Sequence, residues 1–235
     1  MNLRERDASA EELLDAPAFD PCLLDQSLHD LGRLEFVLGW TNLAVSDVAR
    51  LVAQQQLHTF SVLDVATGAA SVPIALARWA RRQKLQVEIT ATDISEQALA
   101  VAAIDCARFH EIRLERQNAL ALTYEPLSFD FVLCQGALHH FAPDAAQMLL
   151  RELARVARRA VIVTDLKRSL LLYLGTWLLM HTLVSHRVTR HDGLASIRRA
   201  YIPREVRALA EQADLHPATV RTTFPFFRQV LIWQR

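Results

Sequence analysis

The ten residues Val62–Ser71, VLDVATGAAS, decide how this chain folds. An apolar run that contains one acid, Asp64, leads into a turn of small residues around Gly68, and a segment with helical spacing follows. Small residues let the backbone pass close to a ligand, and the first turn of a helix offers free N–H groups. Phosphate-binding turns usually carry two or three glycines, whereas this one carries only Gly68. The stretch therefore predicts a strand, a turn and a helix, and by itself leaves the ligand open.

Outward from this stretch, short apolar runs alternate with helical segments. Continuous Val/Ile/Leu runs separated by helices of about 12 residues indicate a parallel sheet that is covered on both faces. The last two runs, on either side of Pro225, should pair as an antiparallel hairpin at one edge of the sheet, because only a short turn joins them. We therefore predict a doubly wound α/β fold. The expected strands are residues 60–66, 87–93, 112–118, 129–136 and 160–165, followed by two within 218–235.

Two further regions flank or interrupt this pattern. Apolar residues recur at helical spacing from Leu23 to Gln56, which predicts an N-terminal helical cap over residues 1–58, with the first ~20 residues frayed. The main domain then covers 59–235. Residues 170–184 are apolar nearly all round, but this segment is shorter than the ~20 residues that a membrane-spanning helix needs. A buried helix, a lid within an insertion at 166–202, a dimer contact and a membrane contact all remain open.

The amino-acid composition limits the kinds of molecule that the protein is expected to bind. Lys plus Arg and Asp plus Glu both number 26, so no net charge steers the protein towards nucleic acid, and a small-molecule substrate is expected. The three cysteines, Cys22, Cys106 and Cys134, show no CxxC spacing, and Cys134 lies in an apolar run that predicts a buried, reduced thiol. The first residues lack the apolar run of a secretory signal, so we expect a cytoplasmic protein.

Polar residues stand where three of the expected strands end. Ligands of doubly wound sheets bind beyond the carboxyl ends of the strands. Asp64 ends the first strand; Asp93 ends the second and could accept both hydroxyls of a ribose; Asn118 follows the third and could bond an adenine edge. Either acid could instead be the N-cap of the helix that follows it. Together the three positions suit one nucleoside.

This combination resembles the class I S-adenosylmethionine-dependent methyltransferases. VLDVATGAAS is similar to their first motif, ATDIS to the segment with the ribose-binding acid, NALAL to the adenine loop and FDFVLCQGALHHF to the fourth-strand motif. The resemblance covers roughly residues 60–167 and implies a Rossmann-like sheet of seven strands with an antiparallel last strand. It also implies S-adenosylmethionine as the cofactor. The cofactor-binding residues that it implies are Asp64, Ala66, Thr67, Gly68, Asp93, Ile94, Asn118, Ala119 and Gln135.

Three positions depart from the family pattern. Ala66 and Ala70 stand where glycine is usual, and Asn118 stands where the adenine contact is often Asp. Alanine is tolerable if the two loop positions need closeness to the ligand and keep a negative φ, which is our expectation. Since a phosphate-gripping loop would suffer more from the replacement, the alanines favour S-adenosylmethionine over NAD. An NAD-dependent oxidoreductase remains the rival reading.

His139 and His140 follow the fourth strand, where the resemblance places a base near the transferred methyl group in relatives that methylate sugars and phenols. In those relatives an acid ends the fifth strand, which here is Asp165. An imidazole can take a proton from a hydroxyl as the methyl group moves in line. The catalytic residues are therefore expected to be His139, His140 and Asp165, with His139 favoured as the base. In the alternative, a histidine only braces the turn.

The side chains of the insertion indicate the chemical class of the acceptor. Tyr173, Trp177 and Met180 make it apolar, so an apolar or aromatic acceptor such as a phenol or polyketide-like compound of natural-product biosynthesis is expected. In the stretch that follows, from His186 to Arg199, Asp192-Gly193 predicts a turn. The basic residues of this stretch are expected to form a solvated rim, although Arg190 or His191 could reach a polar group of the acceptor.

We therefore expect O-methylation of a hydroxyl. C-methylation of a similar acceptor, and a cofactor-binding protein that transfers no methyl group, such as a cyclase or accessory subunit, are the alternatives. No metal is expected, because His139, His140 and Asp144 lack the clustered acids that Mg²⁺ prefers. The oligomeric state stays open, a homodimer included.

Overall fold

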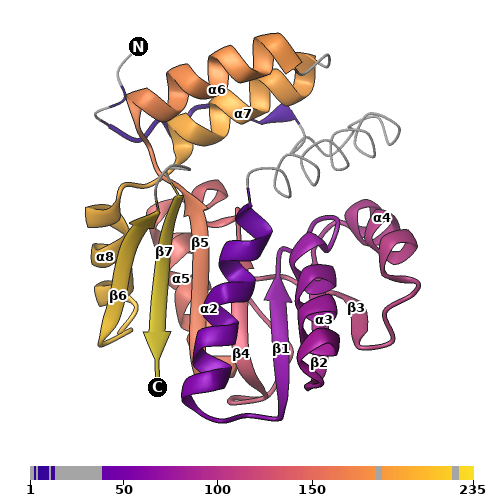
Figure 1. Ribbon diagram of the computed structural model, residues 1–235. Coiled ribbons are helices and arrows are strands. Elements are labelled where there is room, and N and C mark those ends of the chain that lie inside the picture. The colour runs from indigo at the N-terminus through magenta and orange to yellow at the C-terminus, as the bar shows by residue number, and fades with distance from the viewer. Residues whose placement is uncertain (1–2, 4, 11, 14–38, 184–186, 224–227) are drawn as a thin grey trace.

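A computed structural model of the chain describes residues 3, 5–10, 12–13, 39–183, 187–223 and 228–235, without the side chains of 179–183 and 187 (Figure 1). Seven strands form one sheet in the order β3-β2-β1-β4-β5-β7-β6. Neighbours among β1 to β5 are parallel, and β7 is antiparallel to both β5 and β6. The predicted architecture, with its closing hairpin at one edge, is confirmed. The strands are β1 Thr59–Val65, β2 Gln86–Asp93, β3 Ile112–Arg116, β4 Phe129–Gln135, β5 Ala157–Leu166, β6 Ala218–Thr223 and β7 Arg228–Gln234.

Helices cover both faces of this sheet. One core contains buried residues of α2, α3 and α4, and the other contains buried residues of α5 and α8. The central strand β4 is buried over six of its seven residues because it lies between the two layers, which is why its sequence is a continuous apolar run. The helices are α2 Trp40–Gln54, α3 Ser71–Gln83, α4 Glu96–Cys106, α5 Pro143–Val156 and α8 Pro203–Gln212.

Two further helices lie over the carboxyl ends of the parallel strands (Figure 1). α6, Leu170–Leu183, packs against α7, Arg187–Arg199, and α7 contacts the short 3₁₀ helix η2, Leu138–His140. No helix in the described residues is long and apolar enough to cross a membrane. α6 and α7 therefore form a helical cover next to the expected site.

The sequence prediction of a turn at Asp192-Gly193 is wrong, because both residues lie inside α7. Asp192 is buried, and its Oδ1 accepts a hydrogen bond from the backbone N–H of Leu13, 2.8 Å away. Turn preference is a weak local signal, and here a contact with a remote part of the chain outweighs it.

The N-terminal region agrees only in part with expectation. α2 accounts for the end of the predicted amphipathic stretch, whereas 14–38 lie outside the described residues. The described residues among the first 13 are not frayed. The backbone N–H of Asp7 bonds the carbonyl of Arg198 at 3.1 Å, and the Arg168 guanidinium bonds the carbonyl of Leu3 at 3.1 Å. This N-terminal segment, Leu3 to Leu13, packs beside α7.

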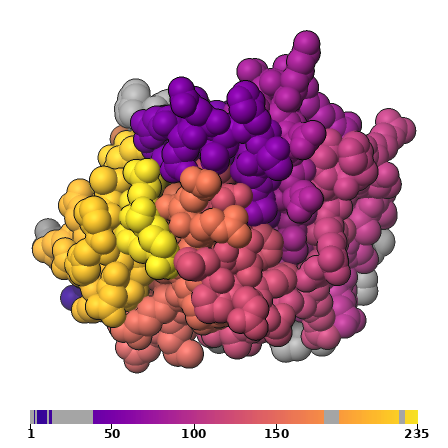
Figure 2. Space-filling view, turned by 90° about the horizontal axis from the view of Figure 1, so that it is seen from below, coloured from indigo at the N-terminus to yellow at the C-terminus, as the bar shows by residue number. Residues whose placement is uncertain are grey.

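The opposite face of the molecule, at the amino-terminal ends of the parallel strands, is filled by α2 and by the end of the chain. Figure 2 shows the indigo surface of α2 bordering the yellow surface of the C-terminal strand. The backbone N–H of Arg235 bonds the carbonyl of Arg159 at 2.9 Å, which fixes the chain end to the start of β5. The carboxyl ends of the strands are therefore the edge on which to look for the site.

Candidate cofactor and acceptor site

The turn after β1 is tied to the neighbouring strand. Asp64 is buried, and its Oδ2 accepts a hydrogen bond from the Thr67 hydroxyl at 2.6 Å. The backbone N–H of Gly68 donates to Oδ2 of Asp93, 3.0 Å away. The N-cap of α3 is Ala70 and not Asp64, so the capping alternative for Asp64 is excluded. These bonds set the path of the turn across the ends of β1 and β2.

Ala66 and Ala70 do not have the expected negative φ. Ala66 has φ +58° and Ala70 φ +57°, both in the left-handed region that normally selects glycine. That expectation was wrong, because the turn has the left-handed conformation at both positions. Gly68 is also left-handed, and a Cβ built there would meet nothing within 4 Å. Open space therefore lies over the middle of the turn.

Asp93 is placed to hold a nucleoside. The N-cap of α4 is Ser95, whose hydroxyl accepts the N–H of Ala98, so Asp93 is not the cap. Its Oδ1 accepts the N–H of Ser95 at 2.9 Å and its Oδ2 that of Gly68, which leaves further lone pairs on both oxygens. Ile94 beside it is 61% exposed, which leaves its side chain open to a flat ring. Both positions fit the predicted contacts.

The end of β3 gives weaker support for a ligand contact than the ends of β1 and β2. Asn118 is exposed, and its Oδ1 accepts the N–H of Leu120 at 3.0 Å within its own turn. Ala119 is half-buried beside it. The adenine contact at Asn118 and Ala119 stays a prediction.

The end of β4 carries the observation that best fits an absent polar ligand. Among the described residues, neither the nitrogen nor the oxygen of the Gln135 amide has a hydrogen-bond partner, although both atoms are buried. The next residue, Gly136, has φ +67° and open space where a Cβ would lie. Since β1 lies between β2 and β4, the strand order reverses at this point, where doubly wound sheets bind their ligands. Asp64, Gly68, Asp93 and Gln135 therefore fit a nucleoside-bearing cofactor.

Beside this cradle, His139 and Asp165 form a buried pair. His139 Nδ1 lies 2.7 Å from Asp165 Oδ1, and the His139 backbone N–H donates to Oδ2 of the same carboxylate, also at 2.7 Å. The two side chains are 4% and 2% exposed. Because an ionised Asp165 accepts from Nδ1, the other ring nitrogen, Nε2, is the one left to face a substrate. Within the described part of the chain, Nε2 has no hydrogen-bond partner.

Burial and charge oppose each other at this pair. Burial by itself lowers the pKa of His139, but the carboxylates of Asp165 and Glu12 outweigh it and raise that pKa to about 9. Burial likewise raises the pKa of Asp165, and the His139 ring, the N–H of Leu166 and the charge of Arg228 outweigh it, so the net direction is down. Asp165 is therefore an anion that favours the protonated imidazole.

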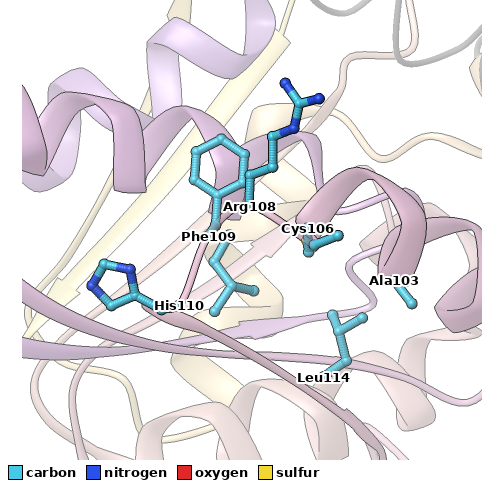
Figure 3. Close-up of a pocket in the computed structure, with 8 residues that line it drawn as sticks. Ala103, Cys106, Arg108, Phe109, His110 and Leu114 are labelled. Atoms are coloured by element: carbon cyan, nitrogen blue, oxygen red, sulfur yellow. The ribbon is translucent and has the colours of Figure 1, made fainter.

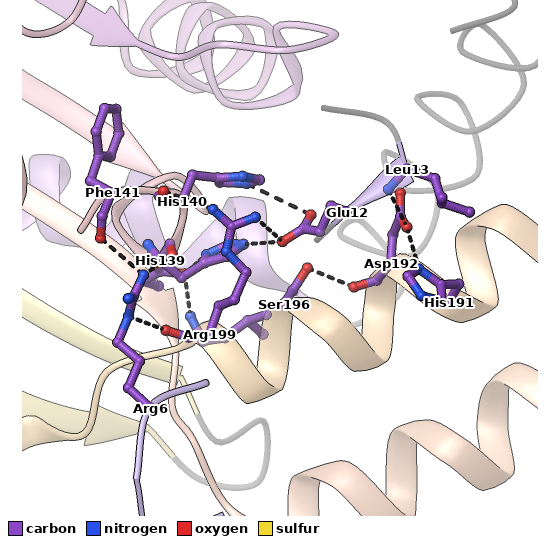
Figure 4. A network of polar contacts seen from close by, with 12 residues as sticks. Arg6, Glu12, Leu13, His139, His140, Phe141, His191, Asp192, Ser196 and Arg199 are labelled. Carbon is purple, nitrogen blue, oxygen red and sulfur yellow. Dashed lines mark hydrogen bonds and ion pairs between the residues drawn. The ribbon is translucent and has the colours of Figure 1, made fainter. Parts of the chain in front are cut away.

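Two residues of this site, Glu12 and Arg6, were not predicted from the sequence, and a third, Arg199, was expected in a solvated rim (Figure 4). Glu12 lies 3.4 Å from His139 Nε2 and 3.9 Å from His140 Nε2. Arg199 places Nη1 3.8 Å from Glu12 Oε1 and donates from Nη2 to the carbonyl of His140 at 2.8 Å, so it belongs to the site and not to a solvated rim. Arg6 donates to the carbonyls of His139 and Phe141. No local motif marks Glu12 or Arg6, because both come from a polar segment with no helical or strand period.

A metal ion is the other group that side chains of this kind could hold. Ligand atoms of Glu12, His139 and His140 lie within 4.8 Å of one another. The Arg199 guanidinium, however, faces the same Glu12 oxygen and supplies positive charge where a cation would sit. We assign none of the three as a metal ligand, and the prediction that no metal is required stays a prediction. Asp144 lies in the first turn of α5 and is exposed.

The other residues singled out in the insertion are spread over α6 and α7. Trp177 is 47% exposed and Tyr173 half-buried on α6. On α7, Arg190 is half-buried and His191 is exposed, with its ring against Asp192. His186, the side chain of Met180, and Cys22 lie outside what the structure describes. Cys106 and Cys134 are buried free thiols, as expected for Cys134.

A hollow elsewhere on the surface is not part of this site. It has a volume of about 460 Å³ and lies between the end of α4 and the start of β3, lined by Cys106, Phe109 and Leu114 among others (Figure 3). Since β3 begins at Ile112, the hollow lies at the amino-terminal edge of that strand, away from the strand ends that carry Asp93 and His139. It contains none of the predicted site residues.

Comparison with known proteins gives a family match and a shared fold. Residues 62–160 match the sequence model of a family described as a methyltransferase domain. A search of curated proteins found no match.

Solved structures share the fold at low sequence identity. An S-adenosylmethionine-dependent methyltransferase from Aquifex aeolicus is 18% identical with a TM-score of 0.60, over 92% of this chain and 98% of that one. Human N-acetylserotonin methyltransferase with bound S-adenosylmethionine is 16% identical with a TM-score of 0.68, over 96% and 59%. The DszA carbon methyltransferase is 12% identical with a TM-score of 0.64, over 87% and 56%.

Proposed function

From the methyltransferase-domain match over residues 62–160 and the shared fold, we propose that this protein is a class I S-adenosylmethionine-dependent methyltransferase that methylates a hydroxyl of an apolar or aromatic small molecule. S-adenosylmethionine is the cofactor, and when bound it supplies an electrophilic methyl group on a sulfonium. Asp64, Gly68, Asp93 and Gln135 are the residues that would hold it, with Ala66, Thr67, Ile94, Asn118 and Ala119 lining the same strand ends.

The observation that carries the proposal is the geometry of His139. Asp165 fixes Nδ1 at 2.7 Å and so sets the tautomer that leaves a lone pair on Nε2 in the neutral ring. A base held in this way can take the proton of an acidic hydroxyl while the oxygen attacks the methyl group, which typically contributes 10²–10⁴-fold in rate. His139 is the base, and Asp165 positions it. His140, half-buried with its ring 4.2 Å from that of His139, lines the acceptor side.

The helical cover favours an apolar acceptor. α7 contacts η2, so the cover lies against the base, and α6 exposes Leu170, Leu171, Leu174, Trp177 and Leu178. We propose that the insertion at 166–202 is a lid for the acceptor on a domain at 59–235, preceded by a cap at 1–58. Buried free thiols at Cys106 and Cys134 fit a reducing cytoplasm.

C-methylation is the second candidate, because the same base would serve an activated carbon and one structural neighbour is a carbon methyltransferase. A panel of alkylphenols and of 1,3-diketones, incubated with S-adenosylmethionine, tests both. We expect S-adenosylhomocysteine with the phenols and loss of at least 100-fold in turnover for His139→Gln. Product from the diketones alone would favour C-methylation. Bound cofactor with no product from either set would favour the binding-protein alternative, and His139→Gln at wild-type turnover would refute the base.

A further inference from the structure

The N-terminal segment is anchored on both sides of Glu12. Arg6 donates from Nη2 to the carbonyls of His139 and Phe141, at 2.8 and 3.0 Å, and from Nε to the carbonyl of Arg199 at 2.8 Å. Its guanidinium also lies over the ring of Tyr201, 4.7 Å from the centroid. After Glu12, the N–H of Leu13 bonds Asp192 of α7. The segment is thereby fastened to the turn that carries the base.

This anchoring brings the Glu12 carboxylate to one atom of the base. Oε1 lies 3.4 Å from Nε2 of His139, and the Glu12 side chain is only 7% exposed. A distance of 3.4 Å is long for a hydrogen bond, so we describe the contact as an ion pair. Figure 4 shows the carboxylate pointing at the two histidines, with the Arg199 guanidinium on the same side as the two rings.

The same position is needed by the acceptor. Nδ1 of His139 is committed to Asp165, so an acceptor hydroxyl can give its proton only to Nε2, and for that it must approach to about 2.6–3.2 Å. We propose that Glu12 occupies the acceptor's place at Nε2 of His139 in the free enzyme and that acceptor binding displaces it. Glu12 is thus a positioning residue that couples the N-terminal segment to the base. The inference rests on the proposed role of His139.

The charges around His139 determine what the displacement does. Asp165 faces the ring from β5, Glu12 from the N-terminal segment, His140 from η2 and Arg199 from α7. Arg228 of β7 lies behind Asp165, and Arg6 bonds the His139 carbonyl. With two carboxylates on its nitrogens the imidazole stays protonated at neutral pH. When one carboxylate withdraws, the desolvation of the buried ring lowers the pKa of His139, and the fraction of neutral base rises.

Protons and bonds balance over the proposed methyl transfer. When the Glu12 carboxylate withdraws, the Nε2 proton passes from the imidazolium to solvent. The neutral ring takes the proton of the acceptor hydroxyl while the new O–C bond forms and the S–C bond breaks, with its electron pair staying on sulfur. The products are the methyl ether, S-adenosylhomocysteine and protonated His139, which is the state that Glu12 stabilises when it returns.

An NMR titration of the imidazole resonances tests the contact without any acceptor. The His139 signals are identified by their loss in His139→Gln, and the titration is done on wild type, Glu12→Gln and Glu12→Asp. The control is Glu5→Gln, which removes a charge of the same kind from an exposed position of the same segment. We expect Glu12→Gln to lower the His139 pKa by about one pH unit, Glu12→Asp to restore part of the value, and Glu5→Gln to leave it unchanged.

Kinetics with an alkylphenol that wild type methylates separates displacement from direct catalysis. Glu12→Gln should lower the KM for the phenol about tenfold, because no carboxylate has to be displaced. An unchanged His139 pKa or an unchanged KM in Glu12→Gln would overturn the proposal. Failure of the base itself is recognised separately by full turnover of His139→Gln, since the titration of His139 still reports whether Glu12 contacts it.

Discussion

The two left-handed alanines of the first turn predict an unusual response to glycine. For a non-glycine residue the left-handed conformation costs about 1–2 kcal/mol, and Ala66 adopts it with φ +58°. Glycine removes that strain but costs about 0.5–1 kcal/mol in backbone entropy. The lost methyl group costs roughly another 0.4 kcal/mol, half the value of a buried CH₂, because Ala66 is half-buried. Ala66→Gly should therefore raise the free energy of unfolding slightly, by about 0.4 kcal/mol.

The neighbouring alanines provide the contrast. Ala70 has φ +57° but is fully buried, so loss of its methyl group cancels the relief and Ala70→Gly should be close to neutral. Ala69 is half-buried like Ala66 but has a negative φ, so Ala69→Gly removes no strain and should destabilise by about 1 kcal/mol. The difference between Ala66→Gly and Ala69→Gly, about 1.5 kcal/mol, measures the strain at Ala66.

Urea unfolding of the cofactor-free protein is the suitable assay, because bound cofactor would add its own free energy to every value. In thermal unfolding the same difference should separate the two variants by about 4 °C. If Ala66→Gly and Ala69→Gly lose the same stability, the turn is not strained at Ala66 and the argument is refuted. Equal affinity of Ala66→Gly and wild type for S-adenosylhomocysteine would show that the turn keeps its path.

Three further outcomes follow from the site. Asp165→Asn should lower kcat at least 100-fold, because the carboxylate that fixes the tautomer of His139 is lost. The affinity for S-adenosylhomocysteine, measured by calorimetry, should stay the same. A parallel loss of that affinity would mean that the cofactor cradle had collapsed. Asp93→Ala should weaken that affinity about tenfold or more. Gln135→Ala should weaken it with no loss of stability, since the amide has no hydrogen-bond partner among the described residues. Unchanged affinity in both variants would remove the two residues from the cradle. The pKa of His139 is raised in the folded protein, so its contribution to stability is complete below the pKa of the unfolded state, near 6.5, and is lost as the pH rises towards about 9. The free energy of unfolding of wild type should therefore fall over this pH range relative to that of His139→Gln. Parallel plots of that free energy against pH would contradict the ion pairs.

The fold was predictable because its signals are local. Runs such as Phe129–Gln135 are apolar at nearly every position, which occurs when a strand is covered on both faces, and the helices between them have a clear period. The site residues at strand ends follow from the same pattern. Once the sheet is inferred, Asp64, Asp93 and Asp165 must lie on one edge of it.

The errors and omissions arise where remote contacts act. Asp192 and Gly193 stay helical because α7 packs under the N-terminal segment, and Arg6 reaches the carbonyl of His139 across 133 positions in the sequence. The left-handed Ala66 could not be inferred either, since alanine carries no signal for positive φ. Glu12 lies in a polar segment whose role depends wholly on where it docks.

The two ends of the described chain differ in what can be attached to them. The carbonyl of Leu3 accepts a hydrogen bond from Arg168, and the N–H of Leu13 bonds Asp192 of α7 on the face that carries His139, whereas Arg235 lies on the far face beside Arg159 (Figure 1). A tag, fluorophore or surface linker joined after Arg235 leaves the catalytic face untouched. The same attachment at the amino end lies next to the segment that carries Glu12. The position of a purification tag should therefore be controlled for when the pKa of His139 is measured.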